Sequence, residues 1–256
     1  MAAGYGRPTR LRVAGMVLAA LMLFCAFPVA AQQPSGWSLG LGAIVSGGRY
    51  GDADTEVTPV PVLGYEGERF FLRGPAAGLR LPRVGGVRSA LVLRARMQSF
   101  DANDDPVLEG METRRRTAEG GLRVGAGKRW LRGHVGIYQE LLGRHHGQVL
   151  EARLQAPLPA GNWLIVPSVG VDWQSAETAD YYYGVRDDEA RGGRPAYAPG
   201  ASVNRVLGLG LRYRGGERFR FVLRVQREFF DSSLRASPIV DRDGRWSGFA
   251  GISWRL

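Results

Sequence analysis

The chain has 256 residues, with 34 basic and 24 acidic side chains and a single cysteine. Lys128 is the sole lysine, so the positive charge is almost entirely arginine, and one cysteine excludes an internal disulfide framework. Basic chains can bind nucleic acid, but the N-terminal segment predicts export to a compartment where nucleic acid is not the usual partner.

Residues 1–31 have the three parts of a secretory signal peptide. Arginines precede an apolar run over residues 13–27, and small residues before Gln32 form the cleavage region. The run is shorter than the roughly 18–20 residues that a membrane-spanning helix needs. We therefore expect residues 1–31 to be removed together with Cys25, leaving residues 32–256 as a single domain.

Beyond the leader, segments of about ten alternating residues followed by a turn recur to the C-terminus, the pattern of an outer-membrane β-barrel. Trp163 and Trp173 lie on one face at the two ends of a strand, the spacing of aromatic side chains at two membrane interfaces. The expected strands cover residues 37–45, 57–65, 68–73, 77–81, 89–98, 117–130, 132–142, 147–157, 162–173, 202–214, 218–229 and 246–256.

The predicted fold is therefore all-β, an antiparallel transmembrane β-barrel of about 12 strands in the outer membrane of a Gram-negative bacterium. Counts of about 10 or 14 remain open because the strands within residues 57–81 are ambiguous. In this region, Pro59 and Pro61 predict an irregular strand at an edge or near a rim. A soluble β-sandwich is the alternative. Arginines on the polar strand faces, and short connections that alternate with long ones, favour the barrel, whose surroundings are then outer-membrane lipid and lipopolysaccharide.

Sequence motifs indicate no catalytic, cofactor or metal site. The run from Asp101 to Asp105 resembles a calcium loop in spacing, but Pro106 replaces the glycine that such a loop requires. His145 and His146 are adjacent and fit a hairpin turn better than a chelate. No nucleophile elbow occurs, so we expect a protein that is not an enzyme.

A set of charged side chains is expected to point into the lumen. Fixed positive charge in a pore favours anions, whereas ladders of arginine and carboxylate would fill a small barrel, and the sequence leaves both possibilities open. The set comprises Arg94, Arg96, Arg123, Arg153, Arg212, Arg218, Arg220 and Arg224 with Glu119, Glu151, Asp172 and Glu228.

Residues 180–200 form a loop with a composition of its own, lying between two long strands. Three tyrosines, an acidic cluster and a Tyr-x-Pro-Gly turn suit either a recognition surface or a self-packed loop. We favour a plug or rim clamp on the lumen side over a free adhesive loop, with Glu189 and its acidic neighbours meeting inward arginines. The candidate residues are Tyr181, Tyr182, Tyr183, Gly184, Asp187, Asp188, Tyr197, Pro199 and Gly200.

Short motifs in a consistent order resemble the MipA/OmpV family of outer-membrane proteins over nearly all of residues 32–256. Two departures are Leu256, where relatives often end in Phe, and Ser202, where glycine is common. The motifs are residues 37–42, Pro59-Val60-Pro61-Val62-Leu63, residues 66–71, Arg73-Gly74, Gly78-Leu79, Phe100-Asp101, Asp104-Asp105, Gly110-Met111, Arg114, Gly121, residues 181–185, residues 197–200 and Ser237-Pro238-Ile239-Val240.

The resemblance implies a barrel without catalytic residues. In one branch of the family it implies a scaffold that brings a murein-degrading lytic transglycosylase together with a bifunctional murein synthase. The other branch implies a porin-like or adhesion protein. The inward arginines independently suggest a channel for small anionic solutes as the alternative to a scaffold.

Overall fold

The computed structural model describes residues 35–48, 50 and 55–256. The predicted signal peptide, its cleavage site and Cys25 lie outside the described residues. No helix in the described part of the chain is long and apolar enough to cross a membrane.

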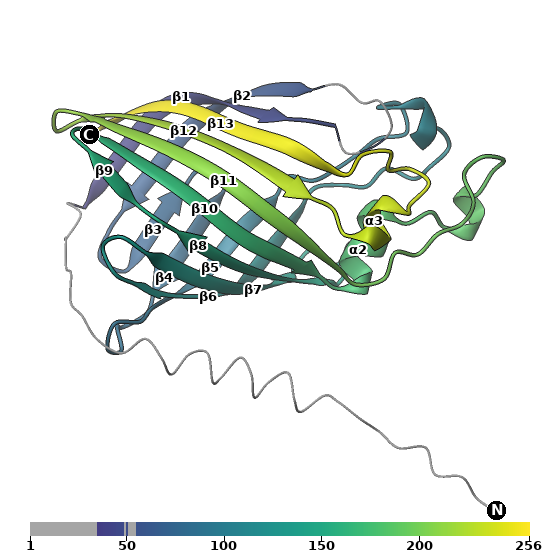
Figure 1. Cartoon of the computed structure of the whole chain (residues 1–256), viewed down its shortest axis with the longest axis horizontal. Helices are drawn as coiled ribbons and strands as arrows, with labels where there is room; N and C mark the ends of the chain where they lie inside the picture. Colours follow the sequence, from purple (N-terminus) through teal and green to yellow (C-terminus); the bar gives the residue numbers. More distant parts are fainter. Residues whose placement is uncertain (1–34, 49, 51–54) are drawn as a thin grey trace, which may run out of the picture.

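Alternating side chains place the chain in one antiparallel sheet that closes on itself, because β13 pairs with β1 and β10 pairs with β11 (Figure 1). The strands are β1 (Gly36–Ser46), β2 (Glu56–Glu66), β3 (Phe70–Arg73), β4 (Ala76–Arg80), β5 (Arg88–Arg96), β6 (Thr117–Gly127), β7 (Arg132–Glu140), β8 (Gln148–Gln155), β9 (Leu158–Ala160), β10 (Trp163–Gln174), β11 (Ser202–Gly215), β12 (Phe219–Phe229) and β13 (Gly244–Arg255).

Both β8 and β9 pair with the same strand, β10, on either side of Ala156 and Pro157. They form one wall strand interrupted by proline, so the 13 assigned strands make a barrel of twelve. The predicted fold class and the preferred strand count are confirmed.

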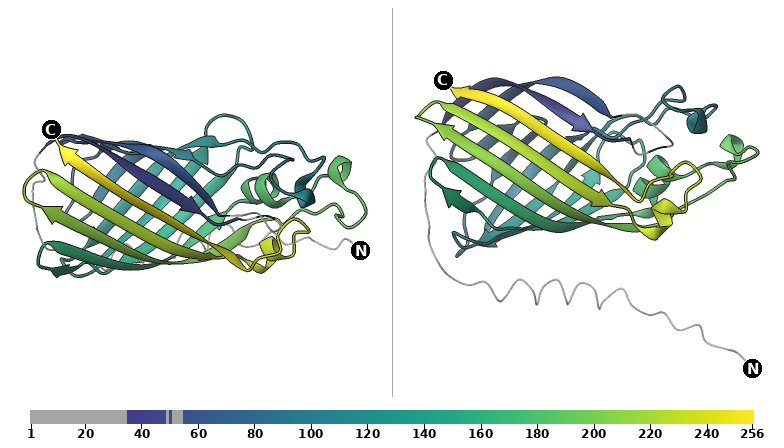
Figure 2. Two further views of the ribbon diagram at one scale, coloured as in Figure 1. Left: turned by 90° about the horizontal axis from the view of Figure 1, so that it is seen from above. Right: turned by 45° about the horizontal axis from the view of Figure 1, so that its top comes forward.

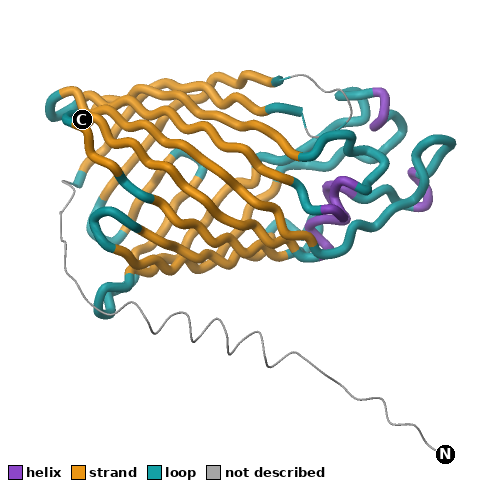
Figure 3. The backbone as a smooth tube through the Cα atoms, viewed as in Figure 1, coloured by secondary structure: helices purple, strands orange, loops and turns teal. Residues whose placement is uncertain are grey.

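The two ends of the barrel differ in their connections (Figures 1 and 2). One end has short turns, such as residues 161–162 and 216–218, and the C-terminus. The other carries the helices α2 (Ala176–Tyr183) and α3 (Ser232–Arg235), the 3-10 helices η1 (Pro106–Leu108) and η2 (Asp187–Glu189), and the long loops (Figure 3). Short turns are periplasmic in such barrels, so the helical end is the outer end.

Outward side chains form an apolar belt with aromatic pairs at the periplasmic end. Leu39 and Leu41 on β1 are 53% and 70% exposed. The rings of Trp37 and Tyr65 lie 4.9 Å apart, and those of Trp163 and Tyr213 lie 4.8 Å apart. Exposed leucines bounded by Trp and Tyr are what a lipid-facing surface requires.

The proline-containing strand is more regular than predicted. β2 pairs with β1 along all 11 of its residues, because prolines do not disturb a ladder on the side to which they would not donate. The expected edge lies on its other flank, where β2 pairs with β3 only over Gly64–Glu66.

Candidate functional site

The lumen has a packed outer half and an open periplasmic half. Near the outer end, Glu119, Asn204 and Ser202 are at most 1% exposed. Toward the periplasm, Arg212 and Arg224 point into the barrel and are nevertheless exposed. Solvent therefore reaches the periplasmic half, whereas side chains fill the outer half.

An ion-pair ladder fills one wall of the outer half. Glu119 accepts from Arg94 Nε at 2.7 Å and from Arg96 Nη1 at 3.0 Å. Arg94 also donates to Glu151 at 2.6 Å, and its guanidinium lies 3.6 Å from the centre of the Tyr138 ring. The register pairs Arg94 with Glu119 on the adjacent strand β6. Glu151 lies two strands further on, on β8, where alternation turns it into the lumen and the long Arg94 side chain reaches it.

Two further groups complete the packed layer. Arg153 Nη2 lies 2.6 Å from Asp172 Oδ2. On the opposite wall, Glu228 accepts from Arg245 Nε at 2.7 Å and from Asn204 Nδ2 at 2.8 Å. Paired, buried charges of this kind close a pore rather than line one.

In the described part of the chain, several arginines of the open half have no carboxylate partner, whereas Arg73 and Arg80 both pair with Glu66. Within the described residues, no ion pair joins Arg123, Arg212 or Arg224 to an acidic side chain. Arg123 Nε donates instead to the Tyr138 hydroxyl at 3.2 Å. Of the other predicted lumen arginines, Arg220 is half-buried at the periplasmic rim and Arg218 is exposed in a turn.

A folded cap covers the outer end. The three consecutive tyrosines, residues 181–183, are the last residues of α2. Tyr182 and Tyr183 are 0% and 1% exposed. They pack with Leu108 from η1, Leu234 from α3 and Ile239. Each long loop thus contributes to one apolar core, which places the tyrosines inside the cap rather than on its surface.

Arg114 connects two of the cap loops. Its side chain is 1% exposed, donates from Nη2 to Glu189 Oε2 at 2.7 Å and donates from Nε to the Tyr181 carbonyl at 2.8 Å. Burial would raise the pKa of Glu189, but the hydrogen bonds from Arg114 and from the backbone N–H groups of Glu112 and Arg186 hold it below its ordinary value. Glu189 is therefore a buried carboxylate.

The end of the tyrosine loop is fixed by two hydrogen bonds. The Tyr197 hydroxyl donates to the Ser233 carbonyl at 2.8 Å. Gly200, at φ 70°, donates its N–H to Asp180 Oδ1 at 3.0 Å, and the neighbouring Pro199 is buried. A positive φ is a position that glycine adopts without strain, which explains the Pro-Gly turn. Gly184 is the C-cap of α2.

The acidic cluster differs from the expectation. Asp187 and Asp188 are exposed, and within the described residues no ion pair joins either to a lumen arginine. Glu189 binds Arg114, which belongs to the 97–116 loop. The expected meeting of these acids with inward arginines is wrong, because η2 projects them from the cap, away from the barrel wall (Figure 2).

His145 supports the cap and is not arranged as a metal ligand. Its ring lies 5.2 Å from Tyr181 and 5.6 Å from Tyr182, and Gly147 N–H donates to Nδ1 at 3.0 Å. Burial first, and then the charge of Arg96, lower the pKa of His145 to about 4. In the described part of the chain, no group of three or more His, Cys, Asp or Glu side chains is placed to hold a metal.

Several charged side chains of the lumen and cap are not among the residues predicted from the sequence. The expected strand begins at residue 246, one residue after Arg245, although even spacing from Ser247 and Gly251 puts Arg245 on the inward face. Arg114 and Arg194 carried no signal of this kind, because loop residues have no period. Arg194 donates to the backbone carbonyls of Val107 at 2.6 Å and Glu109 at 2.9 Å.

Comparison with known proteins agrees with this architecture. The family model described as "MltA-interacting protein MipA" matches residues 39–256. The chain belongs to the MipA family. Family membership and the closed barrel together place it in the outer membrane.

Two relatives of this MipA family chain are named as outer-membrane proteins, and a third is named as an MltA-interacting protein. The putative outer membrane protein YiaT of Escherichia coli is 25% identical, with 89% of this chain and 94% of the relative covered. The MltA-interacting protein of E. coli is 28% identical, covering 86% and 90%. OmpV of Vibrio cholerae is 27% identical, covering 86% of each.

Proposed function

We propose that this barrel is a non-enzymatic scaffold that brings murein-degrading and murein-synthesising enzymes together at the periplasmic face of the outer membrane. One relative is named for its interaction with MltA. The observation that carries the proposal is the charge of the periplasmic turns, because this is the surface that a periplasmic enzyme meets first.

The periplasmic turns are basic. Residues 67–69, 81–87, 128–131, 161–162 and 216–218 contain Arg69, Arg83, Lys128, Arg129 and Arg218, against Glu68 and Glu217. All seven of these charged side chains are exposed. A ring of fixed positive charge attracts a partner with an acidic surface and orients it before contact.

Pull-down of purified murein hydrolase and murein synthase with the solubilised barrel tests the scaffold. The double variant Arg83→Glu and Arg129→Glu should weaken capture, and the loss should resemble that produced by raised salt in the wild type. Arg115→Glu with Arg116→Glu, at the outer end, is the matched control and should capture normally. Wild-type capture at background level contradicts the proposal.

A second candidate function is a pathway for small anionic solutes. The exposed, unpaired Arg212 and Arg224 favour it, because fixed positive charge lowers the barrier to anions. The cap would have to open for passage. Planar-bilayer conductance decides: steps that change selectivity in Arg212→Glu support a channel, whereas absence of steps in the wild-type barrel excludes it.

Lipopolysaccharide is the lipid partner that we propose for the outer rim. Arg115 and Arg116 are exposed there, and Leu141 and Leu142 are 53% and 56% exposed on neighbouring connections. Arginine suits phosphate and leucine suits acyl chains. Reduced lipopolysaccharide retention by Arg115→Glu with Arg116→Glu after detergent washing would support this contact, and unchanged retention would contradict it.

A further inference from the structure

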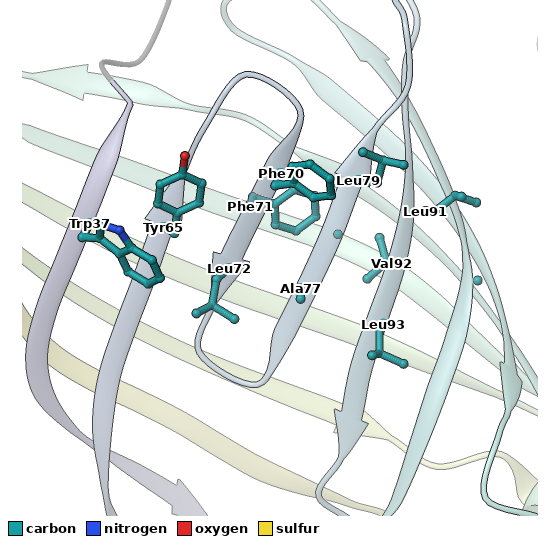
Figure 4. A pocket seen from close by; sticks show the side chains of 12 residues that line it. Trp37, Tyr65, Phe70, Phe71, Leu72, Ala77, Leu79, Leu91, Val92 and Leu93 are labelled. Atoms are coloured by element: carbon teal, nitrogen blue, oxygen red, sulfur yellow. The ribbon is translucent and has the colours of Figure 1, made fainter.

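The barrel wall is incomplete beside β2. β3 and β4 have four and five residues, whereas β2 has 11 and β5 has nine. Figure 4 shows the β3–β4 hairpin turning back while β2 continues past it, and β5 extends beyond the turn only by Ala95 and Arg96. Among the described residues, β2 has a strand partner on this flank only at Gly64–Glu66.

The missing length defines a lateral opening. At the hairpin turn, β2 and β5 are separated by the width of the hairpin, which is three strand spacings or about 14 Å between strand axes. The hairpin turn closes its periplasmic side, where Gly74 N–H donates to the Leu63 carbonyl at 3.0 Å. At the outer side, Gln98 Nε2 donates to the Tyr50 hydroxyl at 3.3 Å, and the Tyr50 and Phe100 rings lie 4.8 Å apart.

Two prolines make the free edge of β2 compatible with contact with lipid. The Leu63 carbonyl points toward β3. Because backbone groups alternate sides along a strand, the N–H and C=O groups of the odd-numbered residues of β2 point toward the opening. Pro59 and Pro61 are two of these residues. An N–H group at either position would lie unpaired in the membrane, at a cost of several kcal/mol, and proline has no N–H. The two prolines also prevent another strand from pairing with β2 at this edge.

The wall behind the opening is apolar except for the Thr58 hydroxyl, which donates to Glu56. Thr58, Val60 and Val62 of β2 face the lumen and are half-buried. The register places Ile44 beside Thr58 and Phe249 beside Ile44. A Cβ atom built on Gly42 would lie 2.9 Å from the Phe249 ring and one on Gly251 2.7 Å from it, so the ring lies over the two glycines.

The apolar strip ends at the unpaired arginines. The register continues from Phe249 to Arg224 on β12, and from Gly251 through Val222 to Arg212 on β11. From β2 to β12 is three strand spacings, or about 14 Å, which is within the length of a common acyl chain. An apolar surface that leads from lipid to two free guanidinium groups complements an amphiphile with an anionic head.

We propose that this opening admits the acyl chain of a single-chain anionic amphiphile from the membrane, with its head on Arg212 and Arg224 and its chain along Phe249 and Val60. A fatty acid carboxylate has this chemistry, and the width of one hairpin suits one chain rather than a multi-chain lipid. An apolar hollow of about 580 Å³ on the lipid side supports the route, since Leu72, Ala77 and Leu93 line it next to the hairpin (Figure 4). The proposal goes beyond the scaffold function and is independent of it.

Photolabelling of the full barrel in phospholipid vesicles tests the proposal, with a diazirine-bearing palmitate as the probe and peptide mass mapping as the readout. Adducts are expected on the lumen-facing residues Ile44, Val60 and Phe249 in addition to the outward Leu39. Arg212→Gln with Arg224→Gln should lower the lumen adducts about tenfold and leave the Leu39 adduct unchanged.

Two further variants address the route itself. Val60→Trp fills the lumen side of the opening and should abolish lumen adducts, whereas Leu207→Trp, on the lipid face of β11, should not. Adducts confined to outward residues in the wild type would overturn the proposal even if Val60→Trp failed to fold. Equal lumen labelling by a two-chain photoreactive phospholipid would also overturn it.

Discussion

Arg114 and Glu189 lie 75 residues apart in the chain and meet at 2.7 Å inside the cap, with 1% and 4% of their side chains exposed. Their contact joins the 97–116 loop to the tyrosine loop. Because neither charge has access to water, each depends on the other, and the cap should behave as one cooperative unit.

Arg114→Ala should therefore loosen the cap. It leaves Glu189 buried without its main partner, a change that typically costs about 3–5 kcal/mol. Arg186→Ala is the control, since its pair with Glu112 is half-exposed and such pairs contribute about 0–1 kcal/mol. Hydrogen exchange over residues 185–200 measures the difference, and equal protection in the two variants would contradict the assignment.

The lumen ladder gives a second prediction. Glu119→Gln removes the carboxylate that binds both Arg94 and Arg96. Arg94 keeps Glu151, but among the described residues Arg96 has no other carboxylate partner, so the free energy of unfolding should fall by about 3–5 kcal/mol. Glu217→Gln in an exposed turn should change it by less than about 0.5 kcal/mol. Urea unfolding of the purified barrel in vesicles compares them; similar midpoints would argue against a structural ladder.

Strand alternation made most of this ladder predictable. Arg94 and Arg96 share a face because side chains repeat every second residue, and Glu119 and Glu151 follow by the same count. The pattern did not indicate which strands are neighbours, or at which position along the barrel axis their charged side chains lie. That information divides the predicted arginines into a paired outer layer and an unpaired periplasmic set, among them Arg212 and Arg224.

The cap was less predictable for a physical reason. Its core combines Leu108, Tyr182 and Leu234 from three separate loops, and loop residues have neither a period nor a register from which contacts can be counted. The same limit applied to Asp187 and Asp188. Their negative charge suggested arginine partners in the lumen, but the loop carries them away from the lumen. The short β3–β4 hairpin was visible in the sequence, but only the register showed that Pro59 and Pro61 face its missing half.

His145 should make the cap sensitive to acid. Burial and Arg96 lower the pKa of this imidazole from its ordinary 6.5 to about 4, against the opposing charges of Glu140 and Glu119. The folded cap therefore holds the neutral ring, so its stabilisation is complete above about pH 6.5 and declines as the pH falls toward 4. In addition, a protonated Nδ1 of His145 can no longer accept the hydrogen bond from Gly147 N–H.

Limited proteolysis of the cap at pH 7.5 and pH 5 measures this effect. Cleavage within residues 175–201 should increase at the lower pH in the wild type. His145→Asn keeps an acceptor for Gly147 N–H without a titrating ring, and its cleavage should change less between the two conditions. The same increase in both proteins would assign the acid response to other groups.

Alanine variants of two inward glycines, Gly121 and Gly210, distinguish the effect of a close contact between strands from the effect of losing a glycine. A Cβ atom on Gly121 would lie 1.9 Å from the Ile137 carbonyl oxygen, whereas one on Gly210 would lie 3.6 Å from its nearest neighbour. The Gly121 contact involves backbone, which cannot rotate away, so Gly121→Ala should force β6 and β7 apart at a cost of about 1–3 kcal/mol. Gly210→Ala adds a methyl group at ordinary contact distance and should fold as the wild type does. The folded fraction after refolding into vesicles, read from the mobility of unheated samples on denaturing gels, gives the comparison; equal yields would mean that β6 and β7 are not as close at this point as their register implies.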